Sequence, residues 1–238
     1  FLQRTHIACC LASALSLASL AFAQKPQTWR NKEVPVPAKF ERVLIFPPEV
    51  QWLQSTATDT RAMGGVSAEL AARLGATLAE QFANQHVEAA ALEGEATSQE
   101  AAGKVEALLA RMQTRFRQAS SVQVSRQPLQ EFNVNSELGE LWPLLGAAKP
   151  DALVISFAFG RDTTRGGAIA GSIGSVFADE PVGKNRLLLR LGFVDAGSGR
   201  MISFCQLETK EGVLNNSEPL HAAVARCVQI FLKPEGAR

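Results

Sequence analysis

The stretch SELGELWPLLGAAKPDALVISFAFG, residues 136–160, carries a helix signal followed directly by a strand signal. Ser136 is a typical helix N-cap, and the leucines after it recur at helical spacing until Gly146 ends the pattern. Pro143 inside this helix predicts a kink or a break. Residues 153–159 are apolar without alternation, which is typical of a strand buried on both faces of a sheet. The stretch therefore predicts an α/β fold in which helices cover the sheet.

Three more helices are predicted on the two sides of this stretch. From residue 66 to 82 apolar side chains recur every four residues, and a second apolar stripe runs from residue 98 to 119. The closing helix begins after Ser217, a candidate cap, and continues to about residue 231. Its apolar side includes Cys227, which we expect to point toward the sheet.

The remaining strands are short. Residues 42–46 form an apolar strand that Pro47 and Pro48 close, and HVEAAALEG from residue 86 is a weak edge strand. Residues 186–210 read as a hairpin whose turn is the D-A-G-S-G run at 195–199. We therefore predict one α/β (α+β) domain over residues 41–238. It has a single mixed sheet of about four or five strands, flanked by helices, with a C-terminal hairpin and helix.

The N-terminal segment has the order of a secretory signal peptide. Arg4 is followed by an apolar stretch and then by Ala21-Phe22-Ala23, the pattern of a cleavage site. Residues 1–23 are therefore excluded from the fold, and residues 24–40, with three prolines, read as an extended leader. We expect the mature protein in the periplasm or secreted, with no transmembrane helix after residue 23.

Charge gives no sign of a nucleic-acid or lipid-surface partner. The chain has 24 Lys and Arg against 23 Asp and Glu, and removing residues 1–23 takes away only Arg4. The mature net charge is then zero, so the basic surface that nucleic-acid binding requires is not expected. The length suits one compact domain of ordinary size.

Four cysteines separate into two pairs. Cys9 and Cys10 lie in the signal segment, whereas Cys205 and Cys227 remain in the mature chain. In an oxidising compartment two remaining cysteines favour a disulfide, and the alternative is two buried thiols that behave as small apolar side chains. The sequence leaves both readings open.

The segment RGGAIAGSIGSVFADEP, residues 165–181, follows the central strand. It matches neither a dinucleotide-binding nor a P-loop glycine pattern. Gly167 and Gly171 have G-x-x-x-G spacing, which lets another backbone approach closely, and the apolar side chains among and beyond them are Ile169, Ile173 and Phe177. These five residues are our candidate contact loop for a protein partner, for self-association or for a membrane. The alternative is a plain loop whose glycines allow tight turns.

Catalytic equipment is sparse. Ser172, Asp195 and His221 occur in the chain order of an α/β-hydrolase triad, but no strand directly precedes the serine and the spacings are short for crossover units. Asp195 also suits a turn, where aspartate caps its own backbone. His86 and His221 begin no zinc pattern. We therefore expect no enzyme, catalytic residue, metal or cofactor, and keep a small serine hydrolase built on that triad as the alternative.

The order of elements resembles two related groups of bacterial envelope proteins. The chain resembles the curli-secretion channel protein family (CsgG) and the periplasmic activators of penicillin-binding proteins (LpoB type) in RVLIFPP, in LGELWPLLGAAKPDALVISF and in the hairpin LLLRLGFVDAGSGRMISF. The resemblance covers most of residues 41–232. It implies a non-enzymatic α/β domain that oligomerises or docks another envelope protein in assembly, secretion or maintenance.

Overall fold

The computed structural model describes residues 26–37, 39–55, 59–92, 99–121, 127–145, 149–163, 186–209 and 212–233. The predicted signal peptide lies outside these residues. The elements follow each other in the order β1 (Gln27–Arg30), β2 (Arg42–Ile45), β3 (Glu49–Ser55), β4 (Thr60–Ala62), α2 (Gly64–Ala83), β5 (Glu88–Ala91), α3 (Gln99–Ser121), α4 (Gln127–Glu131), α5 (Asn135–Leu145), β6 (Ala152–Thr163), β7 (Arg186–Asp195), β8 (Met201–Glu208) and α6 (Glu218–Leu232).

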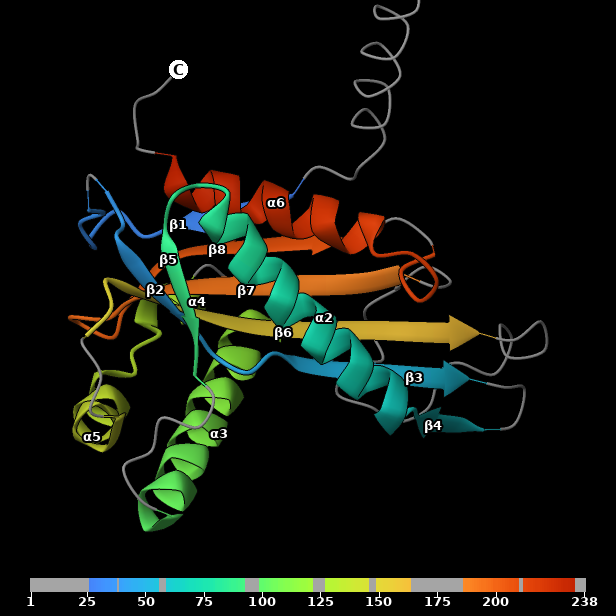
Figure 1. The fold of residues 1–238 in the computed structure, drawn as a ribbon, viewed down its shortest axis with the longest axis horizontal. Coiled ribbons are helices and arrows are strands. Elements are labelled where there is room, and N and C mark those ends of the chain that lie inside the picture. The colour runs from blue at the N-terminus through green and yellow to red at the C-terminus, as the bar shows by residue number, and fades with distance from the viewer. Residues whose placement is uncertain are drawn as a thin grey trace, which may run out of the picture.

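One mixed sheet organises the described chain (Figure 1). Its strand order is β1-β8-β7-β6-β2-β5, and β3 with β4 extends it beside the second half of β6. The α/β class and the flanking helices are confirmed. The predicted four or five strands were too few, because eight strands of the described ranges form the sheet. The central strand β6 is twelve residues long, since β2 pairs with its start and β3 with the part from Phe157 to Thr163.

The strands that the sequence analysis missed are the polar ones. β1 lies in the predicted leader but pairs antiparallel with β8, and Val34 and Phe40 after it are buried in the core. The leader therefore contributes to the domain, and the boundary predicted at residue 41 falls inside the fold. β3 and β4 mix polar and apolar side chains, and they pair antiparallel from Leu53 with Ala62 to Ser55 with Thr60. Neither strand has an apolar run that would predict it, and they join the sheet because β3 pairs with β6.

The sheet separates two apolar layers. Face one is the side covered by α2 and α6, and its buried aromatic residues are Phe40, Trp52, Phe82, Phe193 and Phe231. Face two is the side covered by α3, α4 and α5, and its buried aromatic residues are Phe46, Phe116, Phe132, Phe157, Phe159 and Phe204. Both faces of β6 are therefore buried, as its unbroken apolar sequence predicts.

The turn between β7 and β8 fixes the start of α5. Asp195 Oδ2 accepts hydrogen bonds from the backbone N–H and the hydroxyl of Ser198, at 2.6 and 2.7 Å. The turn-capping role expected for Asp195 is thus confirmed. Gly199 has φ +69°, and a Cβ there would lie 2.3 Å from the backbone nitrogen of Asn135. Only glycine fits this position, because the turn packs directly on the first residue of α5.

Helix starts differ in detail from the sequence prediction. α5 begins at Asn135, whose N–H is accepted by Asn133 Oδ1, so Ser136 lies inside the first turn and is not the cap. Ser217 precedes α6 without a capping bond from its side chain, and Asn216 Oδ1 accepts the Glu218 N–H in its place. Of the kink or break expected at Pro143, the break does not occur: α5 continues through this residue and ends two residues later.

Candidate functional site

The candidate contact loop lies outside the described residues. Gly167, Ile169, Gly171, Ile173 and Phe177, together with Ser172, fall between β6 and β7. The two strands that carry the loop are described, and they pair antiparallel from Ala152 with Asp195 to Arg161 with Arg186. The segment therefore connects neighbouring antiparallel strands at one end of the sheet. We refer to the described residues Ser55, Thr60, Arg161, Arg186 and Glu208 at this end as the distal end.

Polar side chains bridge the strands at the distal end. Arg161 Nε donates to Ser55 Oγ at 2.8 Å, and Ser55 Oγ lies 3.0 Å from Thr60 Oγ1. Arg186 Nη1 lies 3.8 Å from Glu208 Oε2. Arg161 and Arg186 are direct cross-strand partners, so two guanidinium groups face the same side of the sheet at the base of the loop. This arrangement offers hydrogen-bond donors at the base of the loop.

Asp195 and His221 of the alternative triad lie far apart. Asp195 ends β7, four residues beyond Leu191, which pairs with Cys205. His221 lies six residues before Cys227, and Cys227 is bonded to Cys205. The C-terminus of α6 points toward the Asp195 end of β7. Starting from the disulfide, Asp195 therefore lies toward one end of the sheet and His221 toward the other. At about 3.3 Å per strand residue and 1.5 Å per helix residue the separation is about 20 Å. The two residues cannot serve one triad.

The histidines have surface surroundings. His221 Nδ1 lies 3.6 Å from Glu80 Oε2, where α6 passes α2. His86 is exposed, with φ 59°, in the turn between α2 and β5. Within the described parts of the chain, no three His, Cys, Asp or Glu side chains gather so that they could hold a metal ion.

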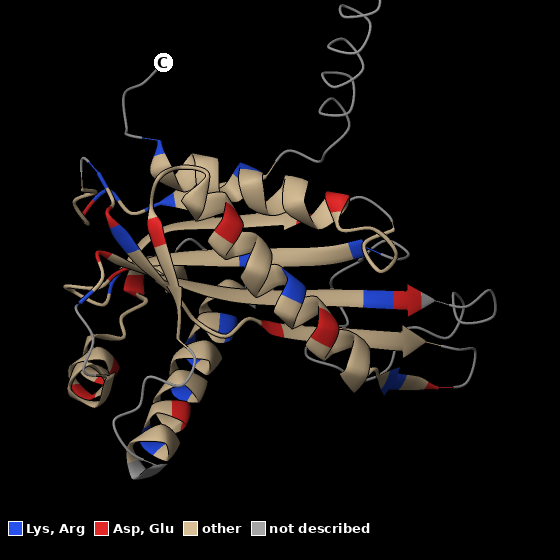
Figure 2. Ribbon diagram, viewed as in Figure 1, with Lys and Arg blue, Asp and Glu red and all other residues tan. Residues whose placement is uncertain are grey.

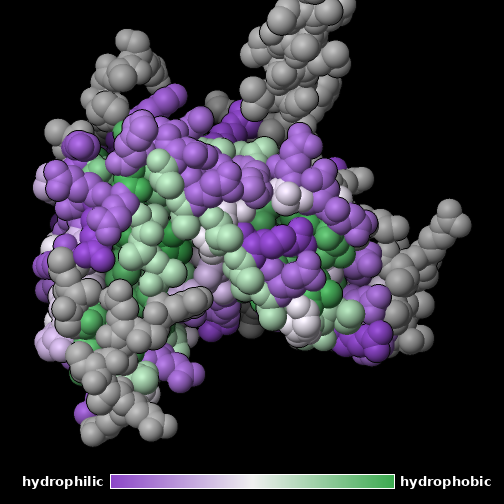
Figure 3. All heavy atoms as spheres, in the orientation of Figure 1, coloured by the Kyte–Doolittle hydropathy of each residue, from purple (hydrophilic) through white to green (hydrophobic). Residues whose placement is uncertain are grey.

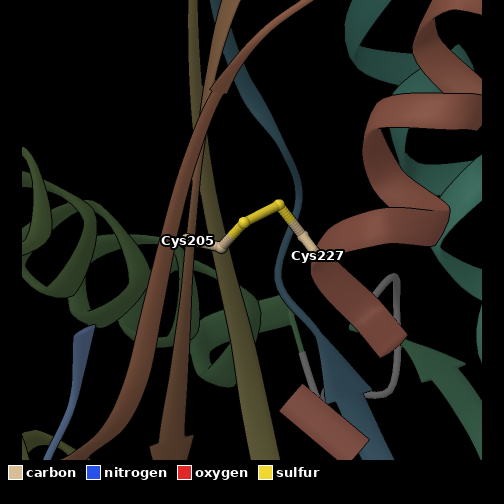
Figure 4. The surroundings of a disulfide bond; sticks show 2 residues. All are labelled: Cys205 and Cys227. Atoms are coloured by element: carbon tan, nitrogen blue, oxygen red, sulfur yellow. A yellow bond between two sulfur atoms is a disulfide. The ribbon is translucent and has the colours of Figure 1, made fainter. Parts of the chain in front are cut away.

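A disulfide joins Cys205 on β8 to Cys227 on α6 across face one (Figure 4). Both residues are buried, at 1% and 0% exposure, and their Cα atoms lie 5.7 Å apart. The bond fixes the last helix of the domain to a strand next to the sheet centre. Disulfides persist in oxidising compartments and are rare in the cytosol.

A polar hollow of about 670 Å³ lies near the opposite end of the sheet, next to the β7–β8 turn. It is lined by Glu33, Gln127, Gln130, Glu131, Asn133 and Arg200. Glu33 accepts hydrogen bonds from Arg200, at 2.6 Å, and from Gln130, at 3.1 Å, and these bonds lower the pKa of its carboxyl group. Figure 2 shows where the Lys, Arg, Asp and Glu residues lie along the chain. Glu33 is thus an ion-pair partner and lacks the raised pKa of a general acid.

The outer edge of β5 is a second candidate surface. β5 ends the strand order beyond β2, and the last two of its alanines are half-buried and exposed. Beside it, α2 exposes Ala68, Ala72, Ala76 and Ala83. Figure 3 shows green and pale-green surface where α2 and β5 lie in Figure 1. The sequence analysis found the strand but missed this surface. The alanine content of residues 68–91 was the available signal.

Comparisons with known proteins give a fold likeness only. No protein-family description matches the chain, and no curated protein matches it. A PelC dodecamer from Paraburkholderia phytofirmans is similar in structure, with 7% identity, a TM-score of 0.40, and coverage of 89% of this chain and 99% of that one. A variant of that dodecamer gives 8% identity, a TM-score of 0.38, and coverage of 88% and 99%. Likeness at this level carries no argument about function.

In the described ranges, no helix combines the length and the apolar character that crossing a bilayer requires.

Proposed function

We propose that this protein works outside the cytosol, in the cell envelope, through contacts with other proteins and without catalysis. The observation that carries the proposal is the buried disulfide between Cys205 and Cys227, because such bonds persist in oxidising compartments and are rare in the cytosol. The signal-peptide order of residues 1–23 supports the same location.

Contact is the activity that the described surface supports best. The sheet has open edges at β1, β4 and β5 among its described strands, and open edges are templates for pairing with another chain. The separation of Asp195 from His221 removes support for the hydrolase alternative. The resemblance to the curli-secretion and penicillin-binding-protein activator families agrees with a docking or self-associating domain, and we keep it as part of the proposal.

In-cell photocrosslinking from position 169 tests the role of the candidate contact loop. A photoreactive residue there is activated in living cells, and the adducts are identified by mass spectrometry. We expect protein adducts, either to a second copy or to another envelope protein. A matched probe at the exposed residue Ala102 on α3 is the control. Adducts at Ala102 but none at position 169 would contradict the contact role of the loop, and lipid-only adducts would make it a membrane contact.

The hydrolase alternative is tested separately with a reactive-serine probe. Labelling of the wild-type chain that Ser172→Ala abolishes would contradict the non-catalytic proposal. We expect the wild-type and the variant to remain equally unlabelled.

A further inference from the structure

We infer that two copies of this chain pair through the outer edge of β5, antiparallel about a twofold axis at Ala90. The inference deepens the proposed role in protein contacts and rests on it. Its first observation is hydrogen bonding. Glu88 N–H donates to Glu41 O and Leu92 N–H donates to Ile45 O, so alternate residues of β5 face β2. Ala89 and Ala91 therefore direct their N–H and C=O groups outward.

The outward groups match a second β5. Around a twofold axis at Ala90, Ala89 lies opposite Ala91 of the second copy, and the reverse holds on the other side of the axis. Both residues present N–H and C=O to each other, which gives two hydrogen-bonded pairs in antiparallel geometry. Between these two pairs, Ala90 lies opposite Ala90 of the second copy and forms a non-hydrogen-bonded pair with it. Alanine at all three positions leaves no side chain that prevents the approach.

Charge also permits this pairing. The one charged residue of β5 is Glu88, which forms an ion pair with Arg42 at 3.5 Å. In the twofold pair it lies opposite Leu92, four residues along the strand from Glu88 of the second copy. That spacing is roughly 13 Å at 3.3 Å per residue, beyond the ~8 Å screening length of physiological salt. The two carboxylates therefore do not oppose association.

The other described edges are protected. β1 follows Pro26 and contains Arg30, and β4 directly follows Asp59 and contains Arg61. Prolines and charged side chains at a sheet edge oppose pairing with another chain. β5 has no proline, lysine or arginine, so it is the edge among the described strands that is best suited to another copy.

The helix above β5 supports the same surface. The charged residues of α2 lie on its α6 side, where Arg73 donates to Val213 O and Glu80 approaches His221. The opposite side presents Ala68, Ala72 and Ala79 and no charge. α2 contacts β5, so the same axis brings the small, uncharged helix sides of both copies toward each other. A twofold dimer is the commonest closed assembly.

The test measures association of the full-length chain by sedimentation equilibrium. We expect a dimer for the wild-type, and Ala91→Pro should raise the dissociation constant at least about tenfold, because proline removes an outward N–H that β2 does not use. Thr28→Pro is the matched control on the β1 edge, since Asn31 N–H donates to Ile202 O and Thr28 therefore faces outward. It should leave association unchanged. Ala91→Lys replaces Ala91→Pro if the proline variant fails to fold.

Disulfide trapping tests the register. In a chain with Cys9→Ser and Cys10→Ser, Ala90→Cys should form a covalent dimer on oxidation, because non-hydrogen-bonded partners have Cα atoms about 4.5 Å apart. Ala102→Cys, exposed on α3, should not. A wild-type chain that stays monomeric at its highest soluble concentration would overturn the inference. So would any oligomer in which Ala90→Cys fails to cross-link. Neither result would decide the proposed function, which the crosslinks from position 169 test separately.

Discussion

Face one and face two bury similar sets of apolar side chains but are held closed by different means. On face one, the disulfide ties α6 to β8, and the rings of Phe193 and Phe231 stack with centroids 4.0 Å apart. Arg30 adds hydrogen bonds to carbonyl groups at the end of α6, including Phe231 O at 2.8 Å. The disulfide, the stacked rings and the hydrogen bonds from Arg30 thus all attach α6 to the sheet.

Face two relies on close fit and on ion pairs near the surface. A Cβ at Gly192 would lie 2.4 Å from a ring carbon of Phe116, so the missing side chain lets α3 approach β7. Arg111 pairs with Glu140 at 3.3 Å, with both side chains more than half exposed, and such pairs contribute little. Face one is thus held closed by a covalent bond and hydrogen bonds, whereas face two depends on the close fit of its side chains.

The largest expected effect comes from the aromatic centre of face one. Phe231→Ala should lower the free energy of unfolding by about 3–5 kcal/mol, because it empties a fully buried site against Phe193, Phe40 and Phe82. Urea denaturation measures the loss. Ile230→Ala, half-buried on the same helix, is the control and should cost clearly less. Equal losses would remove the special role given to this stack.

Removing the disulfide should have the next largest effect. The double variant Cys205→Ala and Cys227→Ala should lose about 3 kcal/mol, since the bond closes a loop with a sequence separation of 22. Thermal unfolding of the wild-type with and without reductant gives an independent measurement. An unchanged midpoint in both experiments would mean that face one needs no covalent attachment.

Face two should respond to added volume. Gly192→Ala should lower the free energy of unfolding by about 1–3 kcal/mol, because the new methyl group meets the buried ring of Phe116. Gly139→Ala on α5 is the matched change, since nothing lies within 4 Å of its added Cβ. That variant should gain up to about 1 kcal/mol from helix propensity. If Gly192→Ala is also neutral, close fit does not hold face two.

The smallest effect concerns Glu49, at the rim of face two. Burial raises the pKa of its carboxyl group, and Arg117 at 2.9 Å partly offsets this. Because the pKa is raised in the folded state, the contribution of the Glu49 carboxyl group to the free energy of unfolding is present at low pH. It is lost as pH rises through the folded-state pKa. Glu49→Gln should therefore match the wild-type below the ordinary carboxyl range and exceed it above by less than about 1 kcal/mol. Unfolding curves from pH 3 to 7 measure the difference, and the opposite slope would contradict the assignment.

The apolar elements of the fold could be predicted from the sequence because their patterns are local. Residues 153–159 are apolar throughout, and the leucines of α2 recur every four residues, so the central strand and a covering helix followed directly. β1 and β3 could not be found this way. Their side chains alternate or are polar, and their partners on β8 and β6 are more than 100 residues away.

The candidate sites show the same limit. The role of Asp195 could be predicted because its partner Ser198 is three residues away. The pair of Glu33 with Arg200 spans 167 residues, and the fit of Gly199 on Asn135 depends on how the turn meets α5. The distance between Asp195 and His221 likewise became visible only from the sheet order and the direction of α6.

The thiol state of Cys205 and Cys227 in protein isolated from its own cells decides whether the domain folds outside the cytosol. The chain is denatured in an alkylating reagent without reductant, and a second sample is reduced first. An envelope protein should show both cysteines blocked before reduction and labelled after it, because the bond across face one forms in an oxidising compartment. Labelling of both cysteines before reduction would contradict the proposed location and, with it, the proposed function.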